Sequence, residues 1–153
     1  MAVWVFPLWK AFHNGKSHIC IGLGLEAIHK GYKVSFTQMD DLIKLLKTEE
    51  ITRTSRTKIK RIVSSDLVII DDLMFMAIER EEANLFFQLI NKLYNQSSII
   101  ITSNKGPEDW GEILGDSAIT TAILDRIMHR SEVINLTGES YRIKNRDTIF
   151  GKS

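Results

Sequence analysis

The stretch Asp66-Leu67-Val68-Ile69-Ile70-Asp71-Asp72 decides the fold of this chain. Its four consecutive apolar residues, three of them β-branched, predict a strand that is buried on both faces. Two carboxylates follow at the C-terminal end of this strand, and in an open parallel sheet that end is where ligands bind. A carboxylate pair there is costly unless it meets a cation or a water molecule to polarise. The alternative is a strand followed by an acidic turn, because Asp is also a common turn residue.

A phosphate-binding signature lies upstream, at Asn14-Gly15-Lys16-Ser17, at the start of an apolar helical segment. Glycine lets the backbone approach a phosphate, the free N–H groups of the helix point at it, and Lys16 adds a full charge. Ser17 can offer its hydroxyl to Mg²⁺, and Asp71 can hold the water shell of that ion from a neighbouring strand. Together with the Asp71 strand, this signature predicts a nucleoside triphosphate site.

The residues just before this signature differ from a full phosphate-binding loop. Such a loop has a glycine five residues before the Gly-Lys pair, and Lys10 occupies that position here. Another frequent glycine position, two residues before Gly15, is His13. Trp9 and Phe12 are bulky where the backbone should pass close to phosphate. The sequence therefore predicts a phosphate loop that binds nucleotide less well than a glycine-bearing one.

Composition and charge limit the class of protein. The chain has 153 residues, 44% hydrophobic and 25% charged, which is ordinary for one soluble globular domain. The net charge of +1 gives no overall field that favours nucleic acid. The one cysteine, Cys20, excludes an intramolecular disulfide and is most simply part of the core. No apolar run approaches the roughly 18 residues of a membrane span, and residues 1–9 lack the basic start and the cleavage site of a signal peptide. We therefore expect a cytoplasmic protein with no membrane partner and a single domain over residues 1–153.

Apolar runs and helical patterns alternate along the chain. This alternation predicts an α/β three-layer domain with a mainly parallel five-stranded sheet, and the phosphate loop after the first strand indicates the P-loop nucleoside triphosphatase architecture. The expected strands cover residues 2–6, 33–37, 67–70, 98–102 and 132–136. The expected helices cover residues 17–30, 42–46, 79–94 and 117–130. We expect the first helix to be largely buried and to end at Gly31 as its C′ residue, and Thr37 or Asp40 to cap the second helix.

Two further features could serve function. A polar stretch from Thr48 to Arg61 carries five basic residues and no acid after Glu50, namely Arg53, Arg56, Lys58, Lys60 and Arg61. It is either a solvated helix face or a patch that contacts the phosphate backbone of DNA. Asn104 follows the strand at 98–102, at the sheet edge where Asp71 is expected. Its amide could orient a water near a γ-phosphate, or it could be a turn residue before Gly106.

Several segments together resemble one family. They are Gly15–His18, Leu67–Leu73, Glu82–Ile90, Ile101–Asn104, Trp110–Glu112, Leu124–Arg126 and Gly138–Arg142. Through them, the chain resembles the IstB-like ATP-binding proteins, which are transposition helper ATPases of insertion sequences. These are AAA+ proteins related to bacterial helicase loaders and replication initiators. Each segment alone is unspecific, and the set is specific to the family.

The resemblance implies roles for particular residues. ATP would be bound by Asn14–His18, with Mg²⁺ held at Ser17 and at Asp71, which matches the Walker B magnesium carboxylate. Asp72 matches the position that polarises the attacking water, and Asn104 matches sensor 1. Arg126 matches the arginine finger supplied to the ATP of a neighbouring subunit. From the residues alone, Arg126 could instead form a surface charge pair with Asp125, although neighbours in sequence do not face each other on a helix.

The resemblance also implies a function. It predicts an ATP-binding DNA-transposition helper that assembles on DNA as a homo-oligomer and assists a transposase. The alternatives are a helicase-loader-like ATPase and a non-hydrolysing remnant that binds only DNA or a partner protein. Family members carry an N-terminal helical region ahead of the ATPase core, whereas this chain begins almost at the first expected strand. We therefore expect an N-terminally truncated AAA+ core in which the altered Walker A loop makes ATP hydrolysis doubtful.

Overall fold

The residues that the structure describes form a central sheet of three parallel strands. The structure, a computed structural model, describes residues 16–73, 78–106, 109–113, 116–129, 131–132 and 134. Within these residues the sheet contains β1 (Val34–Gln38), β2 (Leu67–Asp71) and β3 (Ser98–Ile101), in that spatial order. Val34 lies opposite Leu67, and Leu67 lies opposite Ser98. Three predicted strands and their parallel arrangement are thus confirmed. The strand expected at 2–6 lies outside the described residues, as does most of the strand expected at 132–136.

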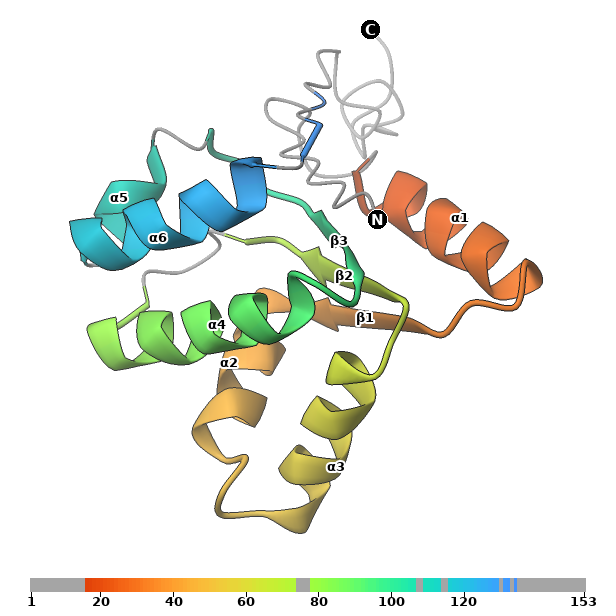
Figure 1. Cartoon of the computed structure of the whole chain (residues 1–153), viewed down its shortest axis with the longest axis horizontal. Helices are drawn as coiled ribbons and strands as arrows, with labels where there is room; N and C mark the ends of the chain where they lie inside the picture. The colour runs from red at the N-terminus through yellow and green to blue at the C-terminus, as the bar shows by residue number, and fades with distance from the viewer. Residues whose placement is uncertain are drawn as a thin grey trace, which may run out of the picture.

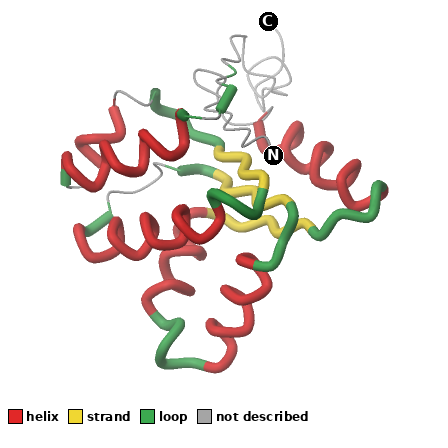
Figure 2. The backbone as a smooth tube through the Cα atoms, viewed as in Figure 1, coloured by secondary structure: helices red, strands yellow, loops and turns green. Residues whose placement is uncertain are grey.

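Helices cover both faces of this sheet, which confirms the three-layer α/β fold (Figures 1 and 2). One face carries α1 (Lys16–His29), and the other carries the remaining long helices. These are α2 (Met39–Lys47), α3 (Arg53–Val63), α4 (Arg80–Leu93) and α6 (Ser117–Met128), with the short α5 (Trp110–Ile113) packed against α6. No helix in the described ranges is long and apolar enough to cross a membrane.

The apolar run of β2 is explained by these two layers. Val68 and Ile70 pack into the main core together with side chains of α2, α3, α4 and α6. Ile69 faces the other way and packs with Cys20 of α1 and Ile100 of β3. All three β2 side chains are at most 1% exposed. A strand covered on both faces needs apolar residues at successive positions, not alternate ones.

Helix α4 begins at a capping box. The Glu82 carboxylate accepts a hydrogen bond from the Glu79 N–H at 2.9 Å, and the Glu79 side chain in turn accepts one from the backbone of Glu82. This reciprocal pair satisfies two N–H groups that the first helical turn would otherwise leave open. Four apolar residues at helical spacing are buried on this helix, namely Ala83, Phe86, Ile90 and Leu93. The stripe therefore belongs to the core.

Helix α1 is far more exposed than its sequence predicts. Its large apolar side chains are 42–53% exposed, at Ile19, Ile21, Leu23, Leu25 and Ile28. In the described residues, α1 buries Cys20 and Gly24 against the sheet. A Cβ atom at Gly24 would lie 3.1 Å from Cδ1 of Ile69, so the helix approaches β2 closely there. The expectation of a largely buried helix was wrong because the apolar residues surround the helix axis, whereas a single stripe meets the sheet.

The ends of α1 and α2 give one confirmation and one correction. Gly31 has φ +86°, and the N–H groups of Gly31 and Tyr32 donate to the carbonyls of Ile28 and Ala27. This is the Schellman arrangement expected of a C′ glycine. The N-cap of α2 is Gln38, with no side-chain cap, so the prediction of Thr37 or Asp40 as cap was wrong.

Candidate functional site

The carboxylate of Asp71 is the centre of the candidate site. It ends β2, is 6% exposed and accepts hydrogen bonds from two hydroxyl groups. Ser17 Oγ, in the first turn of α1, donates to its Oδ2 at 2.8 Å. Thr102 Oγ1, just after β3, donates to its Oδ1. The structure thus brings together Ser17 and Asp71, the two residues that the sequence predicts as magnesium ligands.

Asp72 adopts a left-handed backbone conformation, with φ +61°. This region is rare for residues other than glycine, and Asp is among those that tolerate it. The Asp72 N–H donates to Thr102 Oγ1 at 2.8 Å, and Asn104 Nδ2 donates to Asp72 Oδ1 at 3.2 Å. The chain leaves β2 at this point, so the half-buried side chain of Asp72 has surroundings different from those of Asp71. Backbone strain of this kind gathers at functional sites.

Thr102 is the site residue to which the sequence analysis gave no role. Its hydroxyl donates to the Asp71 carboxylate and accepts from the Asp72 N–H, so it holds both acidic residues. Its backbone is fixed as well, because Thr102 N–H donates to the Ile70 carbonyl at 3.0 Å and Leu73 N–H donates to the Thr102 carbonyl at 2.8 Å. The available signal was a polar residue directly after a buried strand, at the same sheet edge as Asp71.

Cys20 lies one helical turn after Ser17, close to the candidate site. Its side chain is 1% exposed, in the small cluster with Ile69 and Ile100. Burial, followed by the negative charge of Asp71, raises the pKa of the Cys20 thiol to about 12. The thiol therefore stays protonated at neutral pH and is a poor nucleophile. Its place in the core agrees with the sequence prediction.

The phosphate loop is described only from Lys16, where α1 begins. The predicted ATP-binding residues Asn14 and Gly15 lie outside the described residues, and so does the altered stretch from Trp9 to His13. His18 is exposed in the first turn of α1. This turn carries no acidic side chain, which leaves its electrostatic environment suitable for an anion.

Arg126 lies on α6, beside α4. Its guanidinium carbon is 5.2 Å from the centroid of the Phe87 ring, a cation–π arrangement. It borders a crevice of about 500 Å³ that is also lined by Tyr94 and His129, whose hydroxyl and Nδ1 lie 3.1 Å apart. Among the described residues no ion pair joins Arg126 to Asp125, so the charge-pair alternative is wrong. The same residues show no hydrogen bond between Arg126 and the carboxylates of the candidate site.

The basic stretch forms α3 and divides between two sides of that helix. Thr52 caps α3 by accepting from Ser55 N–H at 3.1 Å, and Ser55, Ile59 and Ile62 are buried. All five cations are exposed, as expected of a solvated helix face. Lys58 and Arg61, three residues apart, line a groove beside β1. Spacings of three and four residues group Arg53, Arg56 and Lys60 on another side.

Solved structures share this fold. The DnaC helicase loader matches with a TM-score of 0.71 and 22% identity, over 89% of this chain and 78% of that one. DnaI matches with a TM-score of 0.74 and 17% identity, over 89% and 73% of the two chains. AMPPCP-bound DnaA from Aquifex aeolicus matches with a TM-score of 0.69 and 20% identity, over 88% and 40%. The fold is therefore that of the AAA+ P-loop proteins.

Curated relatives are closer in sequence. The insertion sequence IS21 putative ATP-binding protein of Pseudomonas aeruginosa is 44% identical over 133 residues, which are 86% of this chain and 50% of that protein. The IS5376 putative ATP-binding protein of Geobacillus stearothermophilus is 39% identical over 86% of this chain and 53% of its own length. The chain thus spans about half the length of these relatives. The profile of the IstB-like ATP binding protein family matches residues 11–148, and the chain therefore belongs to this family.

Proposed function

We propose that this chain acts as an ATP-binding transposition helper, which assembles on DNA as a homo-oligomer and assists a transposase. The observation that supports this most is the convergence of Ser17, Asp71, Asp72 and Asn104 at one end of the sheet. The matched relatives are named as insertion-sequence ATP-binding proteins, and one structure of similar fold is a DnaA bound to AMPPCP and single-stranded DNA.

The donor set at Asp71 fits Mg²⁺. This cation prefers oxygen ligands and is usually held by one or two carboxylates together with substrate phosphates. Asp71 and Ser17 offer a carboxylate and a hydroxyl 2.8 Å apart, at the first turn of a helix that has no acid there. When bound, ATP would supply the phosphoryl group, and its Mg²⁺ would offset the negative charge of the phosphates. The roles of the chain are to fix the cation through Asp71 and Ser17 and to face the phosphates with the amide groups that begin α1.

In this proposal the two neighbouring carboxylates have different roles, Asp71 toward the cation and Asp72 toward the attacking water. Asp71 is buried between two hydroxyl donors, so it is a fixed anchor. Asp72 is less buried and is turned by its backbone, which suits a group that accepts a hydrogen bond from the attacking water. Asn104 donates to Asp72 and fixes its orientation. Arg126 acts on the site of the neighbouring subunit, where a guanidinium stabilises the charge of the transition state.

DNA contact is assigned to three of the exposed cations of α3, those on the side away from the β1 groove. Arg53, Arg56 and Lys60 share one side of this helix, and a run of unopposed cations suits phosphates. Neutralising two of them should reduce the magnitude of the slope of log affinity against log salt by roughly 2, at about 0.9 per phosphate contact. An unchanged slope would remove α3 from the DNA-binding surface.

The test is the affinity and turnover of Mg-ATP by the purified chain, with and without duplex DNA. Asp71→Ala should lower Mg-dependent ATP affinity by at least about 100-fold, because loss of even an outer partner of a metal ligand costs about 10–100-fold. Asp72→Asn should keep the affinity and lower the turnover. Equal loss of affinity in both variants would mean that the two carboxylates form a structural pair and would contradict the divided roles.

Arg126→Ala tests the shared site. It should leave ATP binding intact and remove DNA-stimulated turnover, with a loss of about 10³–10⁵-fold. Mixing Arg126→Ala with Asp72→Asn chains should restore part of the turnover, because some interfaces then pair an intact Arg126 with an intact Asp72. No rescue in a mixture shown to co-assemble would contradict a site made by two subunits.

The second candidate is a non-hydrolysing chain that binds DNA or a partner protein. The observation that favours it is the replacement of loop glycines at Lys10 and His13. Tight Mg-ATP binding without turnover would support it. Lys10→Gly together with His13→Gly should raise ATP affinity, and unchanged affinity would show that the interpretation of the loop is wrong. Capture of a replicative helicase by the chain would instead favour a loader, the function for which DnaC is named.

A further inference from the structure

A groove with a volume of about 760 Å³ follows β1 along its whole length. Its walls come from α2 and α3. They consist of the apolar side chains of Leu45 and Ile62, the carboxylate of Asp41, and the cations of Lys44, Lys58 and Arg61. Figure 1 shows β1 at the side of the sheet away from β3, with α2 and α3 beside it. The groove is separate from Asp71 and Ser17, neither of which lines it.

The floor of the groove is the edge of a strand. β1 pairs with β2 through all five of its residues, and within the described ranges it has no strand on its other side. The backbone N–H and C=O groups of such an edge are a template for another extended chain. Proteins often protect an edge of this kind with charged side chains, and Lys58 and Arg61 could have that role.

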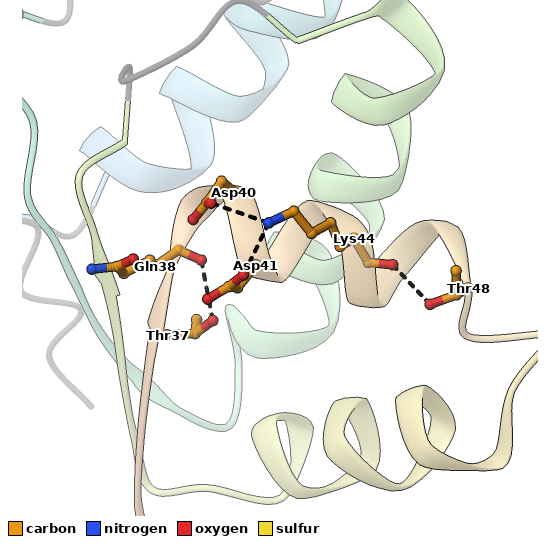
Figure 3. Close-up of polar contacts among 6 residues, drawn as sticks. All are labelled: Thr37, Gln38, Asp40, Asp41, Lys44 and Thr48. Carbon is orange, nitrogen blue, oxygen red and sulfur yellow. Dashed lines mark hydrogen bonds and ion pairs between the residues drawn. The ribbon is translucent and has the colours of Figure 1, made fainter.

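The charges beside the groove are not balanced. Lys44 is bound by Asp40 and Asp41 on its own helix, at 3.3 and 3.2 Å, so its charge is already satisfied (Figure 3). Lys58 and Arg61 form no ion pair with any described residue. Asp40 and Asp41 together carry one negative charge more than Lys44, and Lys58 and Arg61 outweigh it, so the charge beside the groove is positive overall and favours a negatively charged ligand.

The two faces of β1 differ in character. Ser35 and Thr37 point toward the layer of α2 and α3 and are buried, at 8% and 9% exposed. Phe36 points to the opposite face and is 46% exposed. A strand added to this edge would place its alternate side chains beside the α3 cations on one face and beside Phe36 on the other.

We propose that the β1 groove binds an extended segment of a partner protein, in which acidic residues alternate with apolar ones, by adding it as a strand to the edge of the sheet. The acidic side chains lie against Lys58 and Arg61, and the apolar ones cover Phe36. A nucleic acid also carries negative charge, but a sugar–phosphate backbone does not match the hydrogen-bonding groups of a strand edge. This interaction goes beyond the proposed ATP-dependent function and requires neither nucleotide nor DNA.

The test uses a fluorescent peptide that alternates valine with glutamate over about seven residues, enough to cover the five of β1. Its binding to the full chain is measured by anisotropy, against a peptide that alternates valine with glutamine. The glutamate peptide should bind at least about tenfold more tightly at low salt. Equal affinities, or no binding at about 1 mM, would overturn the proposal.

Two matched variants locate the site. Lys58→Gln with Arg61→Gln should weaken binding of the glutamate peptide by about tenfold. Lys30→Gln with Lys92→Gln, the same charge change at exposed positions that do not line the groove, should leave it within about twofold. Mg-ATP affinity should be equal in both, so failure of the peptide result is distinguishable from failure of the nucleotide site. If the first variant instead loses only oligonucleotide binding, the groove is a nucleic-acid site and the proposal is wrong.

Backbone pairing is tested with two N-methylated forms of the peptide. Methyl groups on alternate amides of one edge remove the donors that would face β1, and methyl groups on the other edge leave those donors intact. One form should lose binding and the other should keep it, with slowed amide exchange along Val34–Gln38. Equal binding of the two forms would exclude strand addition.

Discussion

On one face of the sheet, Ile70 packs in a cluster of 20 buried residues, most of them from β2, β3, α2, α3, α4 and α6. On the other face, Ile69 shares its cluster with Cys20 and Ile100. These sets come from the described residues. We call the face of the larger cluster, on which Ile70 packs, the dense face, and the face covered by α1 the sparse face. Ser17 lies on α1, whereas Asp71 belongs to β2, the strand between the two faces. Segments with few buried contacts open most easily. The stability of the fold and its proposed response to nucleotide are thus assigned to opposite faces.

The largest expected effect comes from the adjacent residues Ile70 and Ile69, which have the same chemistry and burial on opposite faces. Ile70→Ala should cost about 2–5 kcal/mol of unfolding free energy, near the upper end, because the surrounding helices cannot collapse into the cavity. Ile69→Ala should fall near the lower end, because α1 rests on it through few contacts. Denaturant unfolding measures both, with Ile→Val variants at both positions as milder controls. Equal losses would abolish the difference between the faces.

Thr102→Val tests the hydroxyl that joins Asp71 and Asp72 at the candidate site, where the strand between the two faces ends. The variant keeps the shape of the side chain and leaves an Asp71 oxygen and the Asp72 N–H without their hydroxyl partner. We expect a loss of about 1–3 kcal/mol of unfolding free energy and weaker Mg-ATP binding. Thr102→Ser keeps the hydroxyl and should lose much less. Full stability with unchanged nucleotide affinity in Thr102→Val would show that this hydroxyl is dispensable.

The dense face also carries an acid-sensitive contact between α2 and α4. The Lys47 ammonium lies 2.8 Å from Glu82 Oε1, and this hydrogen bond lowers the pKa of the Glu82 carboxyl below its ordinary value of 4.5. The contribution to stability is therefore complete above pH 4.5 and is lost as the pH falls through the lowered pKa. Glu82→Gln keeps a side-chain oxygen that can accept from the Glu79 N–H. At pH 7 the variant should lose about 0.5–1 kcal/mol of unfolding free energy relative to the parent chain. At low pH the two chains should be equally stable, because the parent has then lost its ion pair. Unfolding curves from pH 7 to 3 measure the difference, and a pH-independent difference would exclude the ion pair as its source.

At neutral pH, the smallest effect concerns Cys20 on the sparse face. Its folded pKa is raised from 9.0 to about 12, so the unfolded chain ionises first as the pH rises. Stability linked to this thiol is complete below pH 9 and falls as the pH rises from 9 to about 12. Cys20→Ala should lack this decline, and the native thiol should react with a thiol reagent only as fast as α1 opens. Reaction at the rate of a free thiol would show that α1 does not cover the residue.

The sequence was sufficient for the parts of the fold that depend on local pattern. The apolar run from Val68 to Ile70 predicts a strand with helices on both faces. Gly31 predicts the end of a helix, because glycine readily adopts the positive φ found there. Burial of α1 could not be predicted, because apolar residues surround its axis and neighbouring elements decide which of them meet the sheet. The cap of α2 was also missed, because Thr37 donates to the Gln38 carbonyl and Asp40 binds Lys44.

At the site, the sequence located the residues that stand at strand and helix ends. It paired Ser17 with Asp71, which the structure joins at 2.8 Å. It gave no role to Thr102, because a hydroxyl that serves two acids about 30 residues away becomes visible only when the strand register is known. The positive φ of Asp72 was equally hidden, since it depends on how the chain leaves the sheet. The roles of Asp72, Asn104 and Arg126 in chemistry stay predictions.

The parallel pairing of the strands has a consequence for the time course of folding. Ser17 and Asp71 are 54 residues apart, and Thr102 and Asp71 are 31 apart, so no part of the carboxylate site can form from neighbouring residues. Long loops must close before these contacts form, and folding through such contacts is slow. During synthesis, Asp71 is added to the chain 31 residues before its Thr102 partner. We therefore expect the site to close late, so that Mg-ATP present during refolding mainly slows subsequent unfolding and barely changes the early collapse.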